Sequence, residues 1–427
     1  MIDIVAVVAL VAGATFAIAL MPSRKEPVAF TAAAAAVVYG HLRGFFPADR
    51  AFASISMPVI LILISIGIFA ETFSESGVFE RVCRGLAVAV RGSRRALVAV
   101  FLALTYVLSC FLDNLTCLYV LLPVMIGAMR AVGMEGGELR TTVVAIVISG
   151  NLGGASTMIG DFPNILIARS QSIPFIAFMA WMMPACIALL FVLALIVRPR
   201  KAPRQDPIAD TLLVEMISQQ AESVRVDRRL LVPSSATFAL FIVGLVLTGW
   251  WPFPPELVAV GAACLCVWLL PRPQERVVRI DVRSILFIAC LFVFAGAIQA
   301  TGALDRLATA VTSVTRGNPY MLSAAVIVLA CVLTAVFSAG PTTAALIPAA
   351  EALKTQLPGH AIWWCLSLGV LAGSSATLLS ATAGPIATNI LKTRTDIDLT
   401  FGDFLRIGWK AALLFCLLSI GYIWVRI

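Results

Sequence analysis

Long apolar runs separated by short polar segments dominate the chain. About 20 apolar residues are enough to cross the hydrocarbon core of a bilayer as an α-helix. We predict transmembrane helices over ten segments: 2–21, 27–42, 52–73, 141–168, 173–197, 231–250, 256–270, 284–300, 361–391 and 407–424. The pattern therefore predicts an all-α polytopic membrane protein.

Two further apolar stretches, 96–129 and 320–353, are interrupted at their middle by polar and helix-breaking residues. The interruptions are Asp-Asn-Leu-Thr at 113–116 and Ser-Ala-Gly-Pro-Thr-Thr at 338–343. Each arm has about 14 to 18 residues, which is short for a full crossing. We therefore predict two re-entrant helical hairpins whose tips end inside the membrane.

The two halves of the chain resemble each other in register. Residues 76–81 match residues 301–306 at an offset of 225, which also places Pro123 on Pro348, and Thr157 pairs with Thr377 further on. Five spans and one hairpin per copy leave the second copy upside down. We predict two inverted repeats of five transmembrane helices, each with a re-entrant hairpin and an interrupted helix. The first repeat covers 1–198, a cytoplasmic linker 199–230, and the second repeat 231–427.

The composition excludes a soluble enzyme, because 60% hydrophobic and 13% charged residues provide too little polar surface to cover the core in water. With the amino terminus outside, 24 of the 31 Lys and Arg residues fall in segments predicted to be cytoplasmic. The net charge of +8 therefore reflects topology, and no nucleic-acid partner is expected. We expect a multi-pass protein of a prokaryotic inner membrane whose first run is a retained span. Its oligomeric state stays open, with a homodimer as one alternative.

Ionisable residues deep in a membrane are costly and usually functional. Asp113, at the first hairpin tip, and Asp161, in an interrupted span, are the two acids with that placement. Asp113, Asn114 and Thr116 lie beside unpaired backbone groups of two helix ends, a set that suits Na+ or H+. The alternative explanation is local, since an aspartate also caps a helix break or forms a turn before a proline.

The other candidates are polar residues and one proline in the second tip and the interrupted spans: Ser156, Thr157, Asn164, Ser338, Pro341, Thr342, Thr343, Ser375, Thr377 and Thr382. Irregular backbone occurs at membrane depth only where it is buried in protein or lines a watery cavity. We predict that these segments line a substrate path, with tight packing of small residues as the alternative. The ten Cys show no metal-binding spacing, so we expect no cofactor apart from Na+ or H+ as coupling ion.

Two motifs carry a family resemblance: Phe-Leu-Asp-Asn-Leu-Thr at 111–116 and Gly-Gly-Ala-Ser-Thr-Met-Ile-Gly-Asp-Phe-Pro-Asn at 153–164. They resemble signatures of the ion-transporter superfamily and its citrate-transporter-like domain. The similarity is to the arsenite permease and Na+/H+ antiporter branch that includes the melanosomal P protein, and it covers essentially the whole chain. In related carboxylate carriers both hairpin tips bind Na+ and substrate carboxylate. The resemblance implies such roles for Asp113, Asn114, Thr116, Ser338, Pro341 and Thr342.

Two departures from the family pattern refine this expectation. Phe162 replaces a common proline, and Ser338-Ala339 replaces a frequent acidic or amide pair, which makes the second tip more like that of the carboxylate carriers. We expect a secondary active transporter of a small inorganic or carboxylate anion, or of a hydroxylated oxyacid such as arsenite, coupled to H+ or Na+. A Na+/H+ antiporter is one alternative, and a passive channel is an alternative of another class. An enzyme is not expected, because no catalytic constellation is present.

Overall fold

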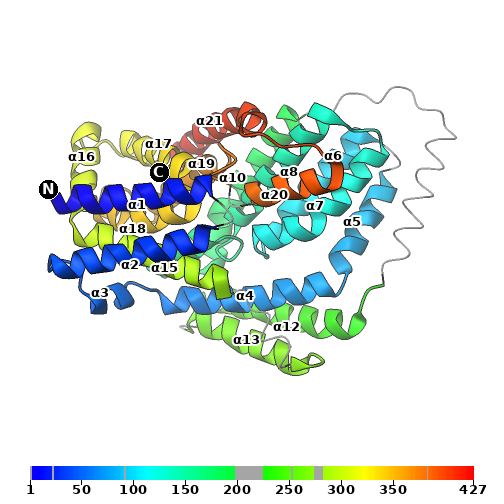
Figure 1. Ribbon diagram of the computed structural model, residues 1–427, viewed down its shortest axis with the longest axis horizontal. Helices are drawn as coiled ribbons and strands as arrows, with labels where there is room; N and C mark the ends of the chain where they lie inside the picture. The colour runs from blue at the N-terminus through cyan, green and yellow to red at the C-terminus, as the bar shows by residue number, and fades with distance from the viewer. Residues whose placement is uncertain are drawn as a thin grey trace.

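The computed structural model describes residues 2–21, 24–90, 93–197, 225–251, 253–273, 282–381 and 383–427. These residues form α-helices and one short 3-10 turn, with no β-strand among them (Figure 1), which confirms the predicted all-α class. Within these ranges, seven helices are long and apolar enough to cross a membrane: α4 (Met57–Glu75), α7 (Asn114–Ala131), α10 (Phe175–Ile196), α12 (Arg228–Leu247), α15 (Val282–Ala300), α17 (Pro319–Phe337) and α21 (Phe401–Arg426).

The remaining helices complete two similar series. In the first half they are α1 (Ile2–Leu20), α2 (Lys25–Leu42), α3 (Ala48–Ala53), α5 (Val78–Ala89), α6 (Arg94–Ser109), α8 (Gly136–Ser156) and α9 (Phe162–Ser170). In the second half they are α13 (Pro255–Leu269), α16 (Ala303–Thr315), α18 (Ala339–Leu353), α19 (Ala361–Ser374) and α20 (Gly384–Thr395), with the 3-10 turn at Lys354–Gln356. The series from α4 to α10 therefore recurs from α15 to α21. Most of the predicted linker lies outside the described residues, and the boundaries at 198 and 231 stay predictions.

Both interrupted stretches are helical hairpins. In the first, α6 and α7 are separated by residues 110–113, and in the second only Ser338 separates α17 from α18. The interrupted spans are α8 with α9 and α19 with α20, each pair joined by unwound backbone. Each of these spans packs its first helix along the first arm of its own hairpin, α8 on α6 and α19 on α17.

Besides the short α3, two helices that correspond to each other, α5 and α16, are absent from the predicted elements. Each begins after a glycine in the left-handed conformation, Gly77 with φ 74° and Gly302 with φ 71°, and the two glycines are 225 residues apart. Because they are short and mix charged with apolar residues, they do not form the long apolar runs by which the other helices are recognised. They lie at opposite ends of the long axis of the molecule (Figure 1), which is the arrangement that inverted repeats produce.

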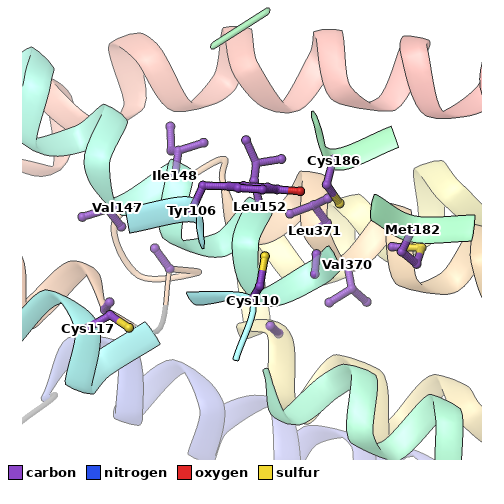
Figure 2. Packing of buried hydrophobic residues seen from close by; sticks show 14 of the residues in the cluster. Tyr106, Cys110, Cys117, Val147, Ile148, Leu152, Met182, Cys186, Val370 and Leu371 are labelled. Carbon is purple, nitrogen blue, oxygen red and sulfur yellow. The ribbon is translucent and has the colours of Figure 1, made fainter. Parts of the chain in front are cut away.

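Helices of the two halves pack against each other. α2 packs on α15 and α13 packs on α4, so the early helices of each half contact the other half. At the centre, side chains of both halves share one core: Figure 2 shows Tyr106 of α6, Leu152 of α8 and Cys186 of α10 close to Leu371 of α19. The two repeats therefore form one interlocked body.

The ion pairs agree with the topology predicted from the basic residues. Asp3–Arg43 (2.8 Å) and Arg169–Glu256 (2.8 Å) join residues of the predicted outer side. Two others join residues of the predicted cytoplasmic side, Arg94–Glu138 (3.3 Å) and Arg140–Asp403 (3.6 Å). Since each of these four pairs stays on one side, the predicted orientation of the helices is self-consistent.

Candidate functional site

A cavity of about 340 Å³ lies where both hairpin tips meet α4 and α15. The helices α4 and α15 supply mostly apolar side chains, and the unwound segment between α8 and α9 supplies another part of the wall. Five predicted site residues line the cavity: Asp113, Thr116, Asp161, Ser338 and Pro341. Residues of two hairpins and one interrupted helix, far apart in sequence, thus come together.

Equivalent positions of the two repeats line this cavity together. The lining contains five pairs of residues that are 225 positions apart: Leu63 and Ile288, Ile66 and Leu291, Asp113 and Ser338, Leu115 and Gly340, Thr116 and Pro341. Inverted-repeat transporters place their sites at such a repeat interface. The unwound segments break the symmetry, because residues 159–163 line the cavity whereas the described residues of 375–383 do not.

Asp113 and Asp161 occupy comparable positions at two helix starts. Asp113 caps α7 and accepts hydrogen bonds from the amides of Leu115 (3.0 Å) and Thr116 (3.3 Å). Asp161 caps α9 and accepts one from the amide of Phe162 (2.9 Å). Helix-start amides and the helix dipole stabilise a carboxylate. Because both side chains also line the cavity, capping and a role in the cavity are compatible.

Glycines in α8 allow the first hairpin tip and the unwound segment that carries Asp161 to approach each other. A methyl group added at Gly154 would lie 3.1 Å from Asn114 Nδ2 and 3.1 Å from Asp161 Cβ, so the hairpin tip and the unwound segment meet at this glycine. A methyl group at Gly153 would lie 2.2 Å from the Tyr106 carbonyl oxygen. The small residues that the sequence offered as packing residues are therefore what places Asp161 beside the first tip.

The cavity has an acidic lining. Glu71 of α4 joins Asp113 and Asp161, and the described lining residues include no Lys, Arg or His. The predicted site omitted Glu71, Thr72 and Ser284, all of which line the cavity. Their signal in the sequence is weak, since each lies near the end of an ordinary apolar helix. The one signal available in the sequence is the repeat: α4 and α15 are equivalent helices, and equivalent helices of two inverted repeats can line the same cavity.

The second tip presents a different chemistry. Ser338 has φ 72° and ψ 161°, a conformation that side-chain-bearing residues rarely adopt, and α18 starts there without a side-chain cap. Ser338, Gly340 and Pro341 line the cavity at this helix start. Uncapped amides at a helix start favour electronegative atoms. The cavity therefore has a capping carboxylate at the first tip, a second carboxylate in the unwound segment, and an uncapped helix amino terminus at the second tip.

Several predicted site residues lie outside the cavity lining and make bonds within the protein. Thr157 donates to the Cys110 carbonyl, and Thr377 donates to the Ala335 carbonyl at 3.1 Å. The other predicted residues outside the lining are fully buried or nearly so: Asn114, Ser156, Asn164, Thr342, Thr343 and Ser375. The hydroxyls of Thr342 and Thr343 have no hydrogen-bond partner among the described residues. Thr382 lies outside the described residues. These residues belong to the structure around the cavity rather than to its wall.

Two of these buried residues, Ser156 and Asn164, show what such bonds do. Ser156 shares a hydrogen bond with the Tyr106 hydroxyl (2.8 Å). Asn164 donates to the Gly154 carbonyl (3.0 Å) and accepts from the Ser367 hydroxyl (2.8 Å). Ser156 thus fixes α8 to the hairpin, and Asn164 joins the interrupted helix of the first half to α19 of the second.

The chain is similar to known membrane transporters. Residues 4–369 match the family model described as "Citrate transporter". The magnetosome protein MamN of Magnetospirillum gryphiswaldense is 29% identical over 424 residues, with 96% of each chain covered. The uncharacterized transporter Mb2703 of Mycobacterium bovis is 28% identical over 410 residues, with 94% of each covered. The P protein of Sus scrofa is 24% identical and matches 87% of this chain but 53% of its own length, in agreement with the resemblance seen in the sequence.

A solved structure has the same fold. Neisseria gonorrhoeae MtrF, described as one of a class of antimetabolite efflux pumps, superimposes with a TM-score of 0.53. The match covers 90% of this chain and 83% of that chain at 13% sequence identity. At this identity the likeness concerns the fold.

Proposed function

Because the chain belongs to the citrate transporter family and is an integral membrane transporter rather than an enzyme, we propose that it is a secondary active transporter whose coupling cation, H+ or Na+, binds between Asp113 and Asp161. The observation that carries this proposal is the acidic cavity, in which both carboxylates face one space. Carboxylates at membrane depth are stable when a proton or a cation neutralises them. Thr116, beside Asp113 in the lining, supplies a further oxygen for Na+.

The transported substrate is a small inorganic or carboxylate anion, or a hydroxylated oxyacid such as arsenite. The start of α18 favours this class, because its uncapped amides and Ser338 suit substrate oxygens. A cation held at the first tip compensates the charge of an anion held at the second. Simultaneous occupation of both tips is then the physical basis of coupling.

Na+/H+ antiport is the second candidate, and one observation favours it. Glu71, Asp113 and Asp161 are all acids, and the described lining residues contain no basic side chain to bind an anion. Two cations competing for these carboxylates would be exchanged without an anion. The two candidates differ in whether an anion moves together with the cation.

Transport by the purified chain in proteoliposomes tests the proposal. Imposed pH and Na+ gradients are combined with radiolabelled citrate and arsenite as probe anions, and cation movement is recorded in parallel. Asp113→Asn keeps the cap but removes the charge, and it should reduce gradient-driven transport by about tenfold or more, the range for losing a charged interaction.

Asp227→Asn is the matched control, because Asp227 also caps a helix, α12, and does not line the cavity. It should leave transport unchanged. Full gradient-driven transport by the Asp113→Asn variant would refute the cation site. Cation exchange without anion movement would favour the antiporter, and unitary currents in a planar bilayer would show a channel.

A further inference from the structure

A chain of buried hydrogen bonds leads from the first hairpin tip into the second half of the molecule. The Ser109 hydroxyl donates to Asn114 Oδ1, and Asn114 Nδ2 donates to Asn151 Oδ1 at 3.4 Å. Asn151 Nδ2 then donates to the Ser374 carbonyl at 3.1 Å. Ser109, Asn114, Asn151 and Ser374 are all at most 6% exposed. The chain starts in α6 and ends at the last residue of α19.

The order of donors and acceptors fixes the direction of this chain. Since Oδ1 of Asn114 accepts from Ser109, its amino group must face Asn151, and the Asn151 amino group must then find another acceptor. That acceptor is a carbonyl of the last turn of α19, a position where carbonyls have no partner within the helix. Asn151 thereby supports the point at which α19 ends and the unwound residues 375–381 begin.

The first amide of this chain, Asn114, lies near both cavity acids. Asn114 directly follows Asp113, and a methyl group at Gly154 would touch both the Asn114 amide and Asp161. A methyl group at Gly150 would lie 3.2 Å from Asn114 Oδ1, so two glycines of α8 make room for this amide. A shift of either acid on binding a cation is therefore passed to Asn114.

Among the described residues of the second half there is no equivalent chain. The positions that correspond to Ser109, Asn114 and Asn151 are occupied by Thr334, Ala339 and Leu371. Without an amide beside it, the buried Thr334 hydroxyl has no partner among the described residues. Buried amides are costly unless they are fully bonded. The repeat that carries the two acids is also the one that has the buried amides of Asn114 and Asn151. Within the part of the protein that the structure describes, the hydrogen-bond chain therefore occurs only in the half with the acidic tip.

We propose that Asn151 is a positioning residue that couples occupation of the acidic site to the unwound segment 375–381 of the second half. The inference rests on the proposed function and adds the route by which cation binding in the first half affects the second half, namely the hydrogen bonds from Asn114 through Asn151 to Ser374. Cation binding orders Asp113 and Asn114, and Asn151 passes this order to the end of α19. Without Asn151, each half moves independently and the substrate crosses without the cation gradient.

Replacement of Asn151 by leucine, the residue at the equivalent position of the second half, tests this role. The Asn151→Leu variant should still exchange the probe anion across the membrane in counterflow. Its uptake should no longer respond to the imposed cation gradient, with a fall in gradient dependence within the about 5- to 150-fold range of coupling between sites. A purely structural role would lower exchange and gradient-driven uptake together.

Ser149→Ala is the matched control, because Ser149 is also buried in α8 and its bond to the Leu102 carbonyl (2.7 Å) stays within the first half. It should keep the gradient dependence. If Asn151→Leu does not fold, Ser109→Ala removes the first donor and leaves α8 intact, and it should weaken coupling in the same direction. If a folded Asn151→Leu or Ser109→Ala variant shows the same gradient dependence as wild type, this inference is wrong and the proposed function is unaffected. A wild-type chain without any gradient dependence overturns the proposed function, and the inference with it.

Discussion

Single glycines decide whether the interrupted helices can approach their hairpins. A methyl group at Gly153 would lie 2.2 Å from the Tyr106 carbonyl oxygen, and one at the equivalent Gly373 would lie 2.4 Å from the Cys331 carbonyl oxygen. Since backbone atoms cannot give way as a flexible side chain can, we expect Gly153→Ala and Gly373→Ala each to lower stability by about 1–3 kcal/mol. Thermal unfolding of the purified protein in detergent measures the loss.

Gly127→Ala is the control for this pair of variants, because Gly127 is also helical but a methyl group there would meet nothing within 4 Å. Alanine favours a helix over glycine, so the control should be as stable as wild type or slightly more stable. Equal stability of all three variants would mean that α8 and α19 are not in close contact with their hairpins.

Residue types alone could not show which polar side chains around residues 151–164 line the cavity and which form hydrogen bonds within the protein. The sequence correctly singled out Asp113 and Asp161 as acids at helix breaks, because a charge in an apolar run is conspicuous. It could not show that Thr157 and Asn164 point to backbone carbonyls, since helical periodicity gives no direction for a side chain once the backbone unwinds.

At the scale of elements, one threonine holds each unwound segment to its hairpin. The Thr157 hydroxyl donates to the Cys110 carbonyl and accepts from the Gly160 amide (3.1 Å). Thr377 repeats this with the Ala335 carbonyl (3.1 Å) and the Ser380 amide (3.0 Å). The two clamps occupy equivalent positions. Only the first adjoins the segment that lines the cavity.

Replacing either threonine by valine tests whether it is a clamp or a ligand. Thr157→Val and Thr377→Val leave a buried amide and a buried carbonyl without their partner, which should cost about 1–3 kcal/mol of stability for each variant. Thr157→Ser keeps the hydroxyl and should behave as wild type. If Thr157→Val kept wild-type thermal stability but lost cation dependence of transport, Thr157 would instead be a ligand of the cation.

The elements themselves were largely predictable, and the exceptions have physical causes. Apolar length located the spans and hairpins, but α21 begins at Phe401, six residues before the predicted start, because Thr400 and Asp403 form a capping box at its polar end. Capping extends a helix beyond its apolar part. The amphipathic helices α5 and α16 escaped notice for a related reason, since only one face of each is apolar.

At the scale of the whole molecule, equivalent positions of the two repeats line one cavity but carry different side chains. The same five positions of each repeat line the cavity, yet the first half supplies Asp113 and the second supplies Ser338 at equivalent positions. Under the proposed function, the symmetry of the backbone would give two orientations for alternating access, and the difference in side chains would place cation and substrate at different tips. This assignment requires that the two repeats are inverted.

The inversion has a direct test in the two amphipathic helices. Gly85 on α5 and Ser313 on α16 are exposed, and the basic residues place α5 on the cytoplasmic side and α16 outside. A membrane-impermeant maleimide should therefore label Ser313→Cys in right-side-out vesicles and Gly85→Cys only in inside-out vesicles. The parent chain gives the background from its ten native cysteines. Labelling of both variants from the same side would show parallel repeats, and a cavity shared by equivalent hairpin tips could then not open to the two sides by the symmetric movement that inverted repeats allow.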